Sequence, residues 1–516
     1  MSVDPSTPVL IGVGQHAERI GQPGYRGLSP VELAAQAARA ALADAQATAG
    51  DAGLASRLDT VAGVRQFEIS TPVAVAPLGR SDNYPRSVAR RLGADPARAI
   101  LEVSGGQGPQ HLITELAGEI AAGRSELALV FGSEAISTVR NLAGADDKPD
   151  FTEHVGGQLE DRGYGLTGLS SKYAREHGLR NAITQYSLFE NARRGRLGLG
   201  SDEYAKLMGE LFAPFTEVAA ANPYASAPVA RSAEELVTAT ERNRYVSDPY
   251  TRMIVARDQV NQGAAVLIAS VATARTLGVP EQRWVYLHGH ADLREQVLLD
   301  RDDLSAYPAA VSAVRHALVQ AEVGLDDIAT FDLYSCFPIA VFAVCDGIGL
   351  ATDDPRGLTL TGGLPFFGGA GNNYSMHAVA ETVGRLRQRP GAVGLVGANG
   401  GALSKYSAAV YSTTPRAWQA IDDAAAQAQI DALPSPAVVE QADGRAVVET
   451  YTVDPGRPGK VGPTVIVVGR LAADGSRFLA RTRPDDAATV AALRAGELLG
   501  RQVDVVSEGG RNYLTI

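Results

Sequence analysis

The chain has few cysteines, no long apolar run and no concentrated positive charge. Its two cysteines among 516 residues, Cys336 and Cys345, are too few for a disulfide framework and too sparse for a zinc site. No window approaches the roughly 18 apolar residues that a membrane span requires, and the N-terminus lacks a basic segment followed by an apolar core. We therefore expect a cytoplasmic protein with no membrane span. The net charge of -11 disfavours a nucleic-acid partner.

Apolar sequence is abundant, and part of it is repeated. With 45% hydrophobic and 20% charged residues, the chain can build a large core divided into two or three globular units. Residues 37–45 read AARAALADA and residues 313–321 read AVRHALVQA, which are identical at five of nine positions. The same offset of 276 residues places PVLIGVGQH at residues 8–16 on WVYLHGHAD at residues 284–292. A strand that feeds a helix therefore occurs twice in the same register.

A second pair of segments supports the duplication. LALVFGSEA from Leu127 parallels AVGLVGANGG from Ala392, and each follows a glycine-rich turn that opens a helix. Two copies of a strand-helix unit predict an α/β fold with two similar halves. Residues 141–257 interrupt the alternation with helical runs and proline-rich stretches, and we interpret them as an inserted covering segment. The first half resumes with the apolar run at residues 263–271.

The composition changes after Pro415. Five runs rich in Val, Thr and Tyr follow, with a helical stretch between the third and fourth, and this order predicts a small β-barrel of the oligonucleotide/oligosaccharide-binding (OB) type. Residues 416–516 carry 11 basic and 13 acidic residues. This balance favours a lid, or a docking module for a protein partner, over a nucleic-acid binder. The predicted domains are residues 1–275, which contain the inserted segment, residues 276–415 and residues 416–516.

Together these features resemble the thiolase superfamily over residues 9–414. The resemblance is carried by the duplicated half, the turn that opens a long helix at residues 105–110, the GSEA at 132–135 and the GGL at 362–364. The YSCF at residues 334–337 stands where sterol-carrier-protein-type thiolases carry His-Asp-Cys-Phe. The resemblance implies a five-layered αβαβα fold, a place in lipid metabolism and acyltransferase chemistry on a coenzyme A (CoA) thioester. That thioester would be a substrate or ligand, with no cofactor. A homodimer is the family default, and a monomer is the alternative because an extra domain is attached.

The residue that should carry this chemistry is missing. Thiolases attack the thioester with a cysteine at a helix N-terminus, where the helix dipole lowers the pKa of the thiol. Aligning GGQGPQ with the family's Cys-Gly-Ser-Gly-Leu-Gln puts Gly105 in the place of that cysteine. Ser104 lies one position earlier and would need an adjacent base, so capping the helix or closing the turn is the simpler role for it. His111, six positions after Gly105, does not align with that cysteine either.

The other two catalytic elements are altered as well. Gly368-Gly369-Ala370 replaces the family's Gly-His-Pro, so Gly369 stands in the place of the catalytic histidine. His377 lies eight residues further on and reaches the site only if the intervening loop folds back. The family's second cysteine falls within residues 397–401, where Asn399 is either a donor to a carbonyl or a turn residue.

The YSCF segment keeps two candidates. Tyr334 stands where relatives carry a residue of the oxyanion hole, and a tyrosine hydroxyl can donate the same hydrogen bond. Cys336 is the one thiol expected at the strand end that forms the site; it is either a reactive thiol or a small buried apolar residue. Cys345 is expected to be buried on a helix. The candidate catalytic residues are therefore Cys336, Tyr334 and His377.

Two further groups of residues bear on ligands. Arg193 and Arg194 fall in the inserted segment, where thiolases hold the CoA phosphates, and arginine suits phosphate through its bidentate fork. A solvated helix face is the other meaning of this basic run. His288 and His290 share one face of a strand, but no third ligand accompanies them, so we predict no metal site. The candidate ligand-binding residues are Gly105, Gly106, Gln107, Gly369, Asn399, Arg193 and Arg194.

Two functions remain open. The protein is an acyltransferase with a rearranged site, or it lacks thiolase activity and binds CoA, an acyl-CoA or a lipid, or regulates a partner through its barrel. The fold alone does not decide between these two functions. The missing nucleophile favours the second function where carbon-carbon bond chemistry is concerned, whereas the polar YSCF favours some retained site.

Overall fold

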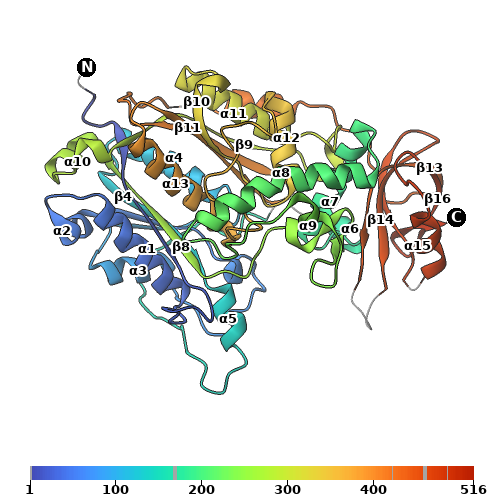
Figure 1. Ribbon diagram of the computed structural model, residues 1–516, viewed down its shortest axis with the longest axis horizontal. Helices are drawn as coiled ribbons and strands as arrows, with labels where there is room; N and C mark the ends of the chain where they lie inside the picture. Colours follow the sequence, from blue (N-terminus) through green and yellow to red (C-terminus); the bar gives the residue numbers. More distant parts are fainter. Residues whose placement is uncertain (1–2, 167–170, 421, 457–461, 485, 516) are drawn as a thin grey trace.

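The computed structural model describes residues 3–166, 171–420, 422–456, 462–484 and 486–515. Ten strands form the sheet of its body. Those of the first half are β1 (Pro8–Ala17), β2 (Thr60–Gly63), β3 (Arg98–Leu101), β4 (Leu127–Glu134), β5 (Glu160–Asp161) and β8 (Gln262–Ser270). Those of the second half are β9 (Val285–Arg294), β10 (Ile328–Asp332), β11 (Val393–Gly400) and β12 (Lys405–Ser412). The strand order is β10-β11-β12-β9-β1-β8-β4-β2-β3-β5. Figure 1 labels β4 and β8 of the first half and β9, β10 and β11 of the second.

The two halves join where β1 and β9 pair antiparallel, with Val9 opposite Tyr286 and Leu10 opposite Val285. Outward from this junction the first half runs β1, β8, β4, β2 and the second half runs β9, β12, β11, β10. Each half therefore repeats one strand order, and the predicted pairing of the segments from Leu127 and Ala392 corresponds to β4 and β11. The predicted duplication is confirmed.

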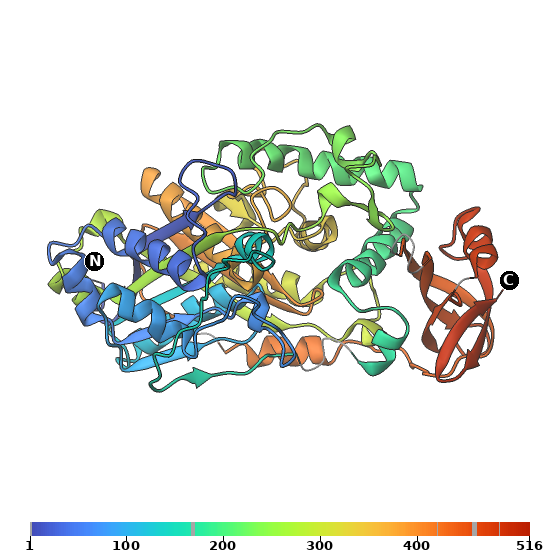
Figure 2. The ribbon, with the colours of Figure 1, turned by 90° about the horizontal axis from the view of Figure 1, so that it is seen from below.

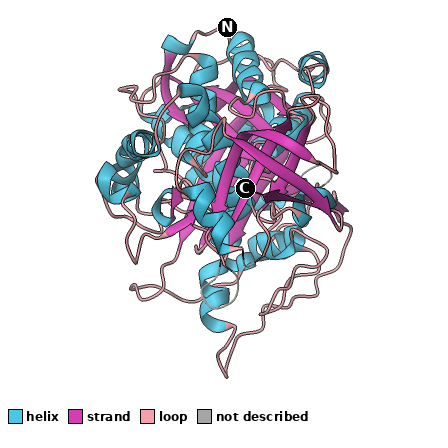
Figure 3. Cartoon of the chain, turned by 90° about the vertical axis from the view of Figure 1, so that its right-hand side faces the viewer, coloured by secondary structure: helices cyan, strands magenta, loops and turns pink. Residues whose placement is uncertain are grey.

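Helices and sheet form five layers. Helices α4 (Gly108–Ala121) and α13 (Tyr374–Gln388) lie in the middle, and their apolar side chains share one core with residues of both halves. Helices α1 (Pro30–Asp44) and α3 (Tyr84–Leu92) pack on the outer face of the first half, and α11 (Pro308–Ala321) and α12 (Pro338–Ile348) pack on that of the second. Seen from the barrel end, helices flank the sheet on both sides (Figure 3). The αβαβα arrangement is confirmed.

The repeated alanine-rich helices have a packing reason. Helix α1 begins at Ser29, whose Oγ accepts the Glu32 N–H, with a proline at the first position. A Cβ at Gly12 of β1 would lie 2.1 Å from the carbonyl oxygen of Ala41, and a Cβ at Gly289 of β9 would lie 2.0 Å from that of Ala317. Glycine on the strand and alanine on the helix thus allow close backbone contact in each half.

The inserted segment covers the second half. Helix α5 (Ile136–Leu142) leads into it, and it contains α6 (Lys172–Glu176), α7 (Ala182–Leu197), α8 (Ser201–Ala221), α9 (Ala233–Val237) and the hairpin β6 (Tyr245–Ser247) and β7 (Tyr250–Thr251). Its aromatic side chains, such as Phe189 and Phe212, join one core with Phe337 and Phe342 of the second half. None of the described helices is long and apolar enough to cross a membrane.

The C-terminal strands close into a small barrel at one end of the molecule (Figure 2). They are β13 (Gly444–Asp454), β14 (Thr464–Leu471), β15 (Arg477–Arg481), β16 (Gln502–Glu508) and β17 (Arg511–Thr515), in the closed order β13-β14-β15-β17-β16. Helix α15 (Ala487–Arg494) lies between the third and fourth strands, as predicted. Helix α14 (Ala424–Asp431) precedes the barrel, and its Ala426 and Ile430 pack in the core of the second half. The C-terminal segment therefore contacts the second half before the first barrel strand begins at Gly444.

Buried polar contacts fix the barrel to the inserted segment. Thr450 Oγ1 donates to the Leu188 carbonyl over 2.6 Å, and the Leu479 N–H donates to the Tyr173 hydroxyl over 2.8 Å. His177 Nε2 accepts the Asn512 N–H over 2.9 Å. Burial lowers the pKa of His177, which keeps its ring neutral and able to accept this bond.

Arg477 of the barrel contacts the body with a fully buried side chain. It pairs with Glu449 of the barrel and donates to the carbonyl oxygens of Leu299 at 2.9 Å, Asp302 at 3.0 Å and Arg301. One side chain thus pairs with a carboxylate of the barrel and donates to three backbone carbonyls of the body.

We predict that Arg477→Ala lowers the free energy of unfolding by about 3 kcal/mol, because it leaves a carboxylate and several carbonyls unpaired at a buried contact. Chemical denaturation measures this loss, and limited proteolysis before residue 444 should become faster. Arg470→Ala is the matched control, since Arg470 also pairs with Glu449 but is 32% exposed; we expect a cost below about 1 kcal/mol. Equal losses in the two variants would contradict this role of Arg477.

Candidate ligand-binding site

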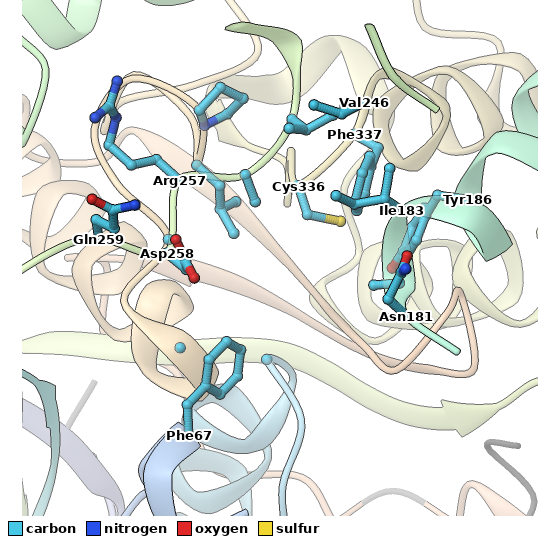
Figure 4. A pocket seen from close by; sticks show the side chains of 18 of the residues that line it. Phe67, Asn181, Ile183, Tyr186, Val246, Arg257, Asp258, Gln259, Cys336 and Phe337 are labelled. Carbon is cyan, nitrogen blue, oxygen red and sulfur yellow. The ribbon is translucent and has the colours of Figure 1, made fainter. Parts of the chain in front are cut away.

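A cavity of about 1030 Å³ lies where the inserted segment meets the ends of β10 and β11 and the N-terminus of α4. Three predicted elements line it together: the glycine turn at residues 104–106, Tyr334 and Cys336 after β10, and Asn399 on β11. Cys336 lies near the centre, with Phe67 and Arg257 on one side and Ile183 and Tyr186 on the other (Figure 4). The apolar lining of the cavity includes Met253, Val255, Leu364 and Phe366.

The glycine turn has lost both the nucleophile and the room for it. Gly105 has a φ of +147°, and its N–H donates to Asn372 Oδ1 over 2.9 Å. A Cβ at Gly105 would lie 2.1 Å from Gln107 Oε1, and one at Gly106 would lie 2.2 Å from the Tyr334 hydroxyl. The Gln107 amide therefore occupies the space beside Gly105. Gln107 itself is buried behind the turn and does not line the cavity, so its predicted ligand contact is wrong.

Ser104 lines the cavity without a base. Among the described residues its hydroxyl bonds to the Ser70 carbonyl alone, over 3.3 Å. The Lys405 ammonium donates to the backbone carbonyls of Ser104 and Gly165. Ser104 thus closes the turn, as one of its two predicted roles states, and is not activated as a nucleophile.

Cys336 is buried and uncharged. Its Sγ lies 3.7 Å from Asn399 Nδ2 and near the Tyr186 hydroxyl, and the Tyr186 ring stacks on Phe337 at 4.2 Å between centroids. Burial raises the pKa of the Cys336 thiol to about 12. A thiol without a base remains protonated at neutral pH, so this geometry favours the structural role of Cys336 over the reactive one. Cys345 is buried on α12, as predicted.

Tyr334 offers a free donor to the cavity. Its hydroxyl has no hydrogen-bond partner among the residues that the structure describes, and it lies against Gly106. Burial raises the pKa of Tyr334 well above its usual value, which keeps the hydroxyl protonated. The ring packs edge-on against Tyr374 at 5.3 Å, which fixes its orientation. Tyr334 can therefore donate to an oxygen atom of a ligand near the turn.

Asn399 lines the cavity with its amide already committed. Its Nδ2 donates to the Tyr186 hydroxyl over 2.7 Å, and its Oδ1 accepts from the Tyr307 hydroxyl over 2.9 Å. Asn399 thus holds the cavity wall together. Asn372, which the sequence analysis did not single out, binds the Gly105 N–H and donates to the Arg65 carbonyl over 2.7 Å. The only sequence signal for it is its place in the polar run before α13.

His377 is not part of the site. It lies in α13, outside the cavity lining, and its Nδ1 donates to Gln15 Oε1 of β1 over 2.7 Å. Burial lowers the pKa of His377 to about 3. The predicted catalytic role is wrong because α13 starts directly at Tyr374, so His377 falls where the helix packs on the sheet. Gly369 does line the cavity, and its N–H donates to the Arg257 carbonyl over 2.8 Å.

Arg193 and Arg194 also lie away from the cavity. Arg193 pairs with Asp346 at 2.8 Å and lies over the Phe342 ring, whereas Arg194 pairs with Glu497 of the barrel region at 2.5 Å. The prediction that they hold phosphates is wrong, because α7 presents both guanidinium groups to α12 and to the barrel. Both are structural.

Other arginines take their place around the cavity. Arg180, Arg231, Arg242, Arg244, Arg252 and Arg257 line it, and among the described residues Asp258 is the only acidic residue that does so. Asp258 already pairs with Arg140 at 2.5 Å. Burial lowers the pKa of Arg257, and the nearby charges of Arg252 and Arg231 lower it further. Glu235 also lies 3.9 Å from Arg231, so this positive charge is neutralised only in part. The sequence analysis missed it because the six residues are scattered singly along the inserted segment.

Histidines outside the cavity have structural partners. His288 and His290 bond to the carbonyls of Thr414 and Gln419, over 2.8 and 3.2 Å. His111 lies close to Glu102 and Glu115, but Arg162 bonds to both carboxylates over 2.6 Å and occupies the space a metal would need. Burial alone would lower the pKa of His111; Asp292 and these carboxylates raise it to about 9.

The wall of the cavity is connected to the barrel. Gly401 and Ala402 line the cavity, and Arg301 donates to the carbonyls of Ala402 and Leu403 over 3.2 and 2.6 Å. The carbonyl of Arg301 in turn accepts from Arg477 of the barrel. Docking of the barrel therefore supports the loop after β11.

Comparison with known proteins agrees with this architecture. Residues 426–510 match the family model of the thiolase-like protein type 1 additional C-terminal domain. No curated protein sequence matches the chain. The crystal structure of a monomeric SCP2-thiolase-like protein type 1 from Mycobacterium smegmatis is 52% identical, covers 100% of both chains and superposes with a TM-score of 0.85.

More distant structures share the fold. The dimeric peroxisomal thiolase of Saccharomyces cerevisiae is 13% identical over 80% of this chain and 98% of its own, with a TM-score of 0.57. The acetyl-CoA acetyltransferase of Syntrophomonas wolfei is 14% identical over 79% of this chain and 98% of its own, with a TM-score of 0.55. The 52% identity to the Mycobacterium smegmatis structure over the full length of both chains shows that this chain belongs to the SCP2-thiolase-like proteins type 1, within the thiolase superfamily.

Proposed function

We propose that the protein binds an acyl thioester of CoA in the cavity and does not form a covalent acyl intermediate on it. The observation that carries this proposal is the turn at Gly105: the cavity of about 1030 Å³ is present, while the place of the nucleophile holds a glycine whose φ of +147° disfavours a side chain. Cys336, the remaining thiol, is protonated and has no base. The site thus supports binding better than thiolysis.

Three groups of residues divide the recognition of this ligand. The free hydroxyl of Tyr334 donates to the thioester carbonyl. The apolar lining that includes Ile183, Met253 and Leu364 takes the acyl chain. The positive charge around Arg257 takes the phosphates, and it favours a CoA thioester over an uncharged lipid.

The barrel belongs to this proposal as a support. Its strand order and the place of α15 are those expected of the OB type. Its buried contacts favour a fixed part of the body over a mobile lid. A protein partner of the barrel, a cytoplasmic location and a place in lipid metabolism stay predictions.

Intact mass spectrometry tests the absence of a covalent step. After incubation with acetyl-CoA and mixed 3-ketoacyl-CoAs, we expect an unchanged mass under conditions that acylate a thiolase, because Cys336 is not ionised. Cys336→Ser should bind palmitoyl-CoA as the natural chain does, within about threefold. An acyl adduct that maps to Cys336 and disappears in Cys336→Ala would instead establish the acyltransferase function.

Calorimetric titration tests the charged part of the site. We predict that Arg252→Gln with Arg257→Gln weakens binding of palmitoyl-CoA at least about tenfold, because each guanidinium contributes a charge-assisted hydrogen bond to phosphate. Arg196→Gln is the control, since Arg196 is exposed and pairs with Asp346 outside the cavity. Unchanged affinity in the double variant, or no binding by the natural chain, would remove the CoA proposal.

We also propose that the chain is a monomer. A thiolase-type dimer would pair across the strand before the helix that carries the nucleophile, and the corresponding strand here is β3. Strand β5 of the same chain pairs with β3, with Ile100 opposite Glu160, and Arg98 holds Glu160 at 2.7 Å. The edge that a second copy would need is therefore covered.

Light scattering after size exclusion tests the monomer. We expect a mass near 53.9 kDa that does not change with protein concentration. A doubled mass would show that dimers form by another surface or that β5 leaves its place. Hydrogen exchange of the β3 amides separates these two cases, since protection of β3 by its own chain does not depend on concentration.

A further inference from the structure

Exposed apolar side chains line the cavity or lie in the loop that follows one of its lining residues. Phe67, Leu166 and Val229 line the cavity and are also exposed large hydrophobic residues. Val73 and Val75, which are 85% and 75% exposed, follow the lining residue Thr71 in the same loop. Single exposed hydrophobic residues are ordinary on proteins, but a group around one opening marks a contact surface.

The fold gives no reason for the two valines of this group. Among the described residues, neither Val73 nor Val75 belongs to an apolar cluster, and neither lies in a helix or strand. Val319 of α11 is equally exposed, at 75%, but lies on the outer layer of the second half. Val319 is therefore an exposed valine that does not lie at the cavity.

The charge at the mouth is opposite to that of the chain. The chain carries a net charge of -11, yet six arginines line the cavity. Arg242, Arg244 and Arg252 are exposed there. Of the nearby acids, Glu235 pairs weakly with Arg231 at 3.9 Å, and Asp258 is held by Arg140. The mouth therefore attracts an anionic surface although the whole molecule does not.

An anionic lipid membrane satisfies both features. Its phosphate plane matches the arginines, and the acyl layer directly below it accepts Phe67, Val73 and Val75. An acidic protein would match the charge but would leave the protruding valines unexplained unless it also had an apolar face. We propose that the mouth of the cavity docks on an anionic membrane, so that an acyl chain passes between bilayer and cavity without crossing water. Only the identity of that ligand rests on the proposed function.

Vesicle sedimentation tests the docking directly. The full chain is mixed with vesicles of phosphatidylglycerol and phosphatidylcholine, or of phosphatidylcholine alone, at low and at physiological salt. We expect binding to the anionic vesicles that weakens as salt is raised, and at least about tenfold weaker binding to the neutral ones. Absence of binding to anionic vesicles at low salt overturns the proposal, including when an acidic protein binds the mouth instead.

Matched variants assign the binding to the mouth. Val73→Asp with Val75→Asp should reduce vesicle binding at least about tenfold, because charge replaces the side chains that enter the acyl layer. Arg242→Glu with Arg244→Glu should do the same through charge. The control for the valine pair is Val319→Asp. The control for the arginine pair is Arg90→Glu with Arg315→Glu, which are exposed residues of outer helices and change the net charge as much as that pair does. Equal losses in variants and controls overturn the proposal.

Titration of the same variants with palmitoyl-CoA in solution separates the two proposals. Val73→Asp with Val75→Asp should retain this affinity, because neither valine lines the cavity. Vesicle binding without affinity for palmitoyl-CoA would keep the docking surface and remove the CoA ligand. Affinity for palmitoyl-CoA without vesicle binding would keep the ligand and remove the membrane.

Discussion

The space beside Gly105 decides what this site can do. The turn keeps the approach of a helix N-terminus to a cavity, but the Gln107 amide lies 2.1 Å from where a side chain at Gly105 would start. Gly106 is closed in the same way by the Tyr334 hydroxyl. Restoring a cysteine at Gly105 would therefore require the Gln107 side chain to move, and the positive φ of Gly105 would add strain. The backbone conformation of the turn is therefore the main obstacle to a side chain at this position, because the end of the Gln107 side chain can move.

The cavity behind this turn is supported from an unexpected direction. Arg301 holds the loop at Ala402 and Leu403, and Arg477 of the barrel holds the backbone of residues 299–302. The barrel thus acts on the cavity through two arginines and a short stretch of backbone. This arrangement gives the C-terminal domain a role without any ligand of its own, and it connects the stability of the barrel to the shape of the cavity wall.

The fold could be predicted from local pattern, whereas most of the site could not. The repeat of AARAALADA and AVRHALVQA is visible because alanine must recur wherever a helix contacts a glycine-bearing strand. Tyr334 and Cys336 were found because a strand end places them together. His377, Arg193 and Arg194 were misplaced because their sequence neighbourhood does not reveal which way a helix face turns. The cavity arginines went unseen because six single residues come together only when the inserted segment folds over the sheet.

By itself, the sequence determined the two-fold repeat, the five strands of the barrel and the absence of a cysteine at the turn, since each depends on residue type at fixed spacing. Tertiary structure alone decided that the Gln107 side chain lies beside Gly105, that β5 covers the edge of β3 and that six arginines line the cavity. The physical reason is that space, exposure and charge balance are properties of neighbours in space, which the order of residues along the chain does not reveal.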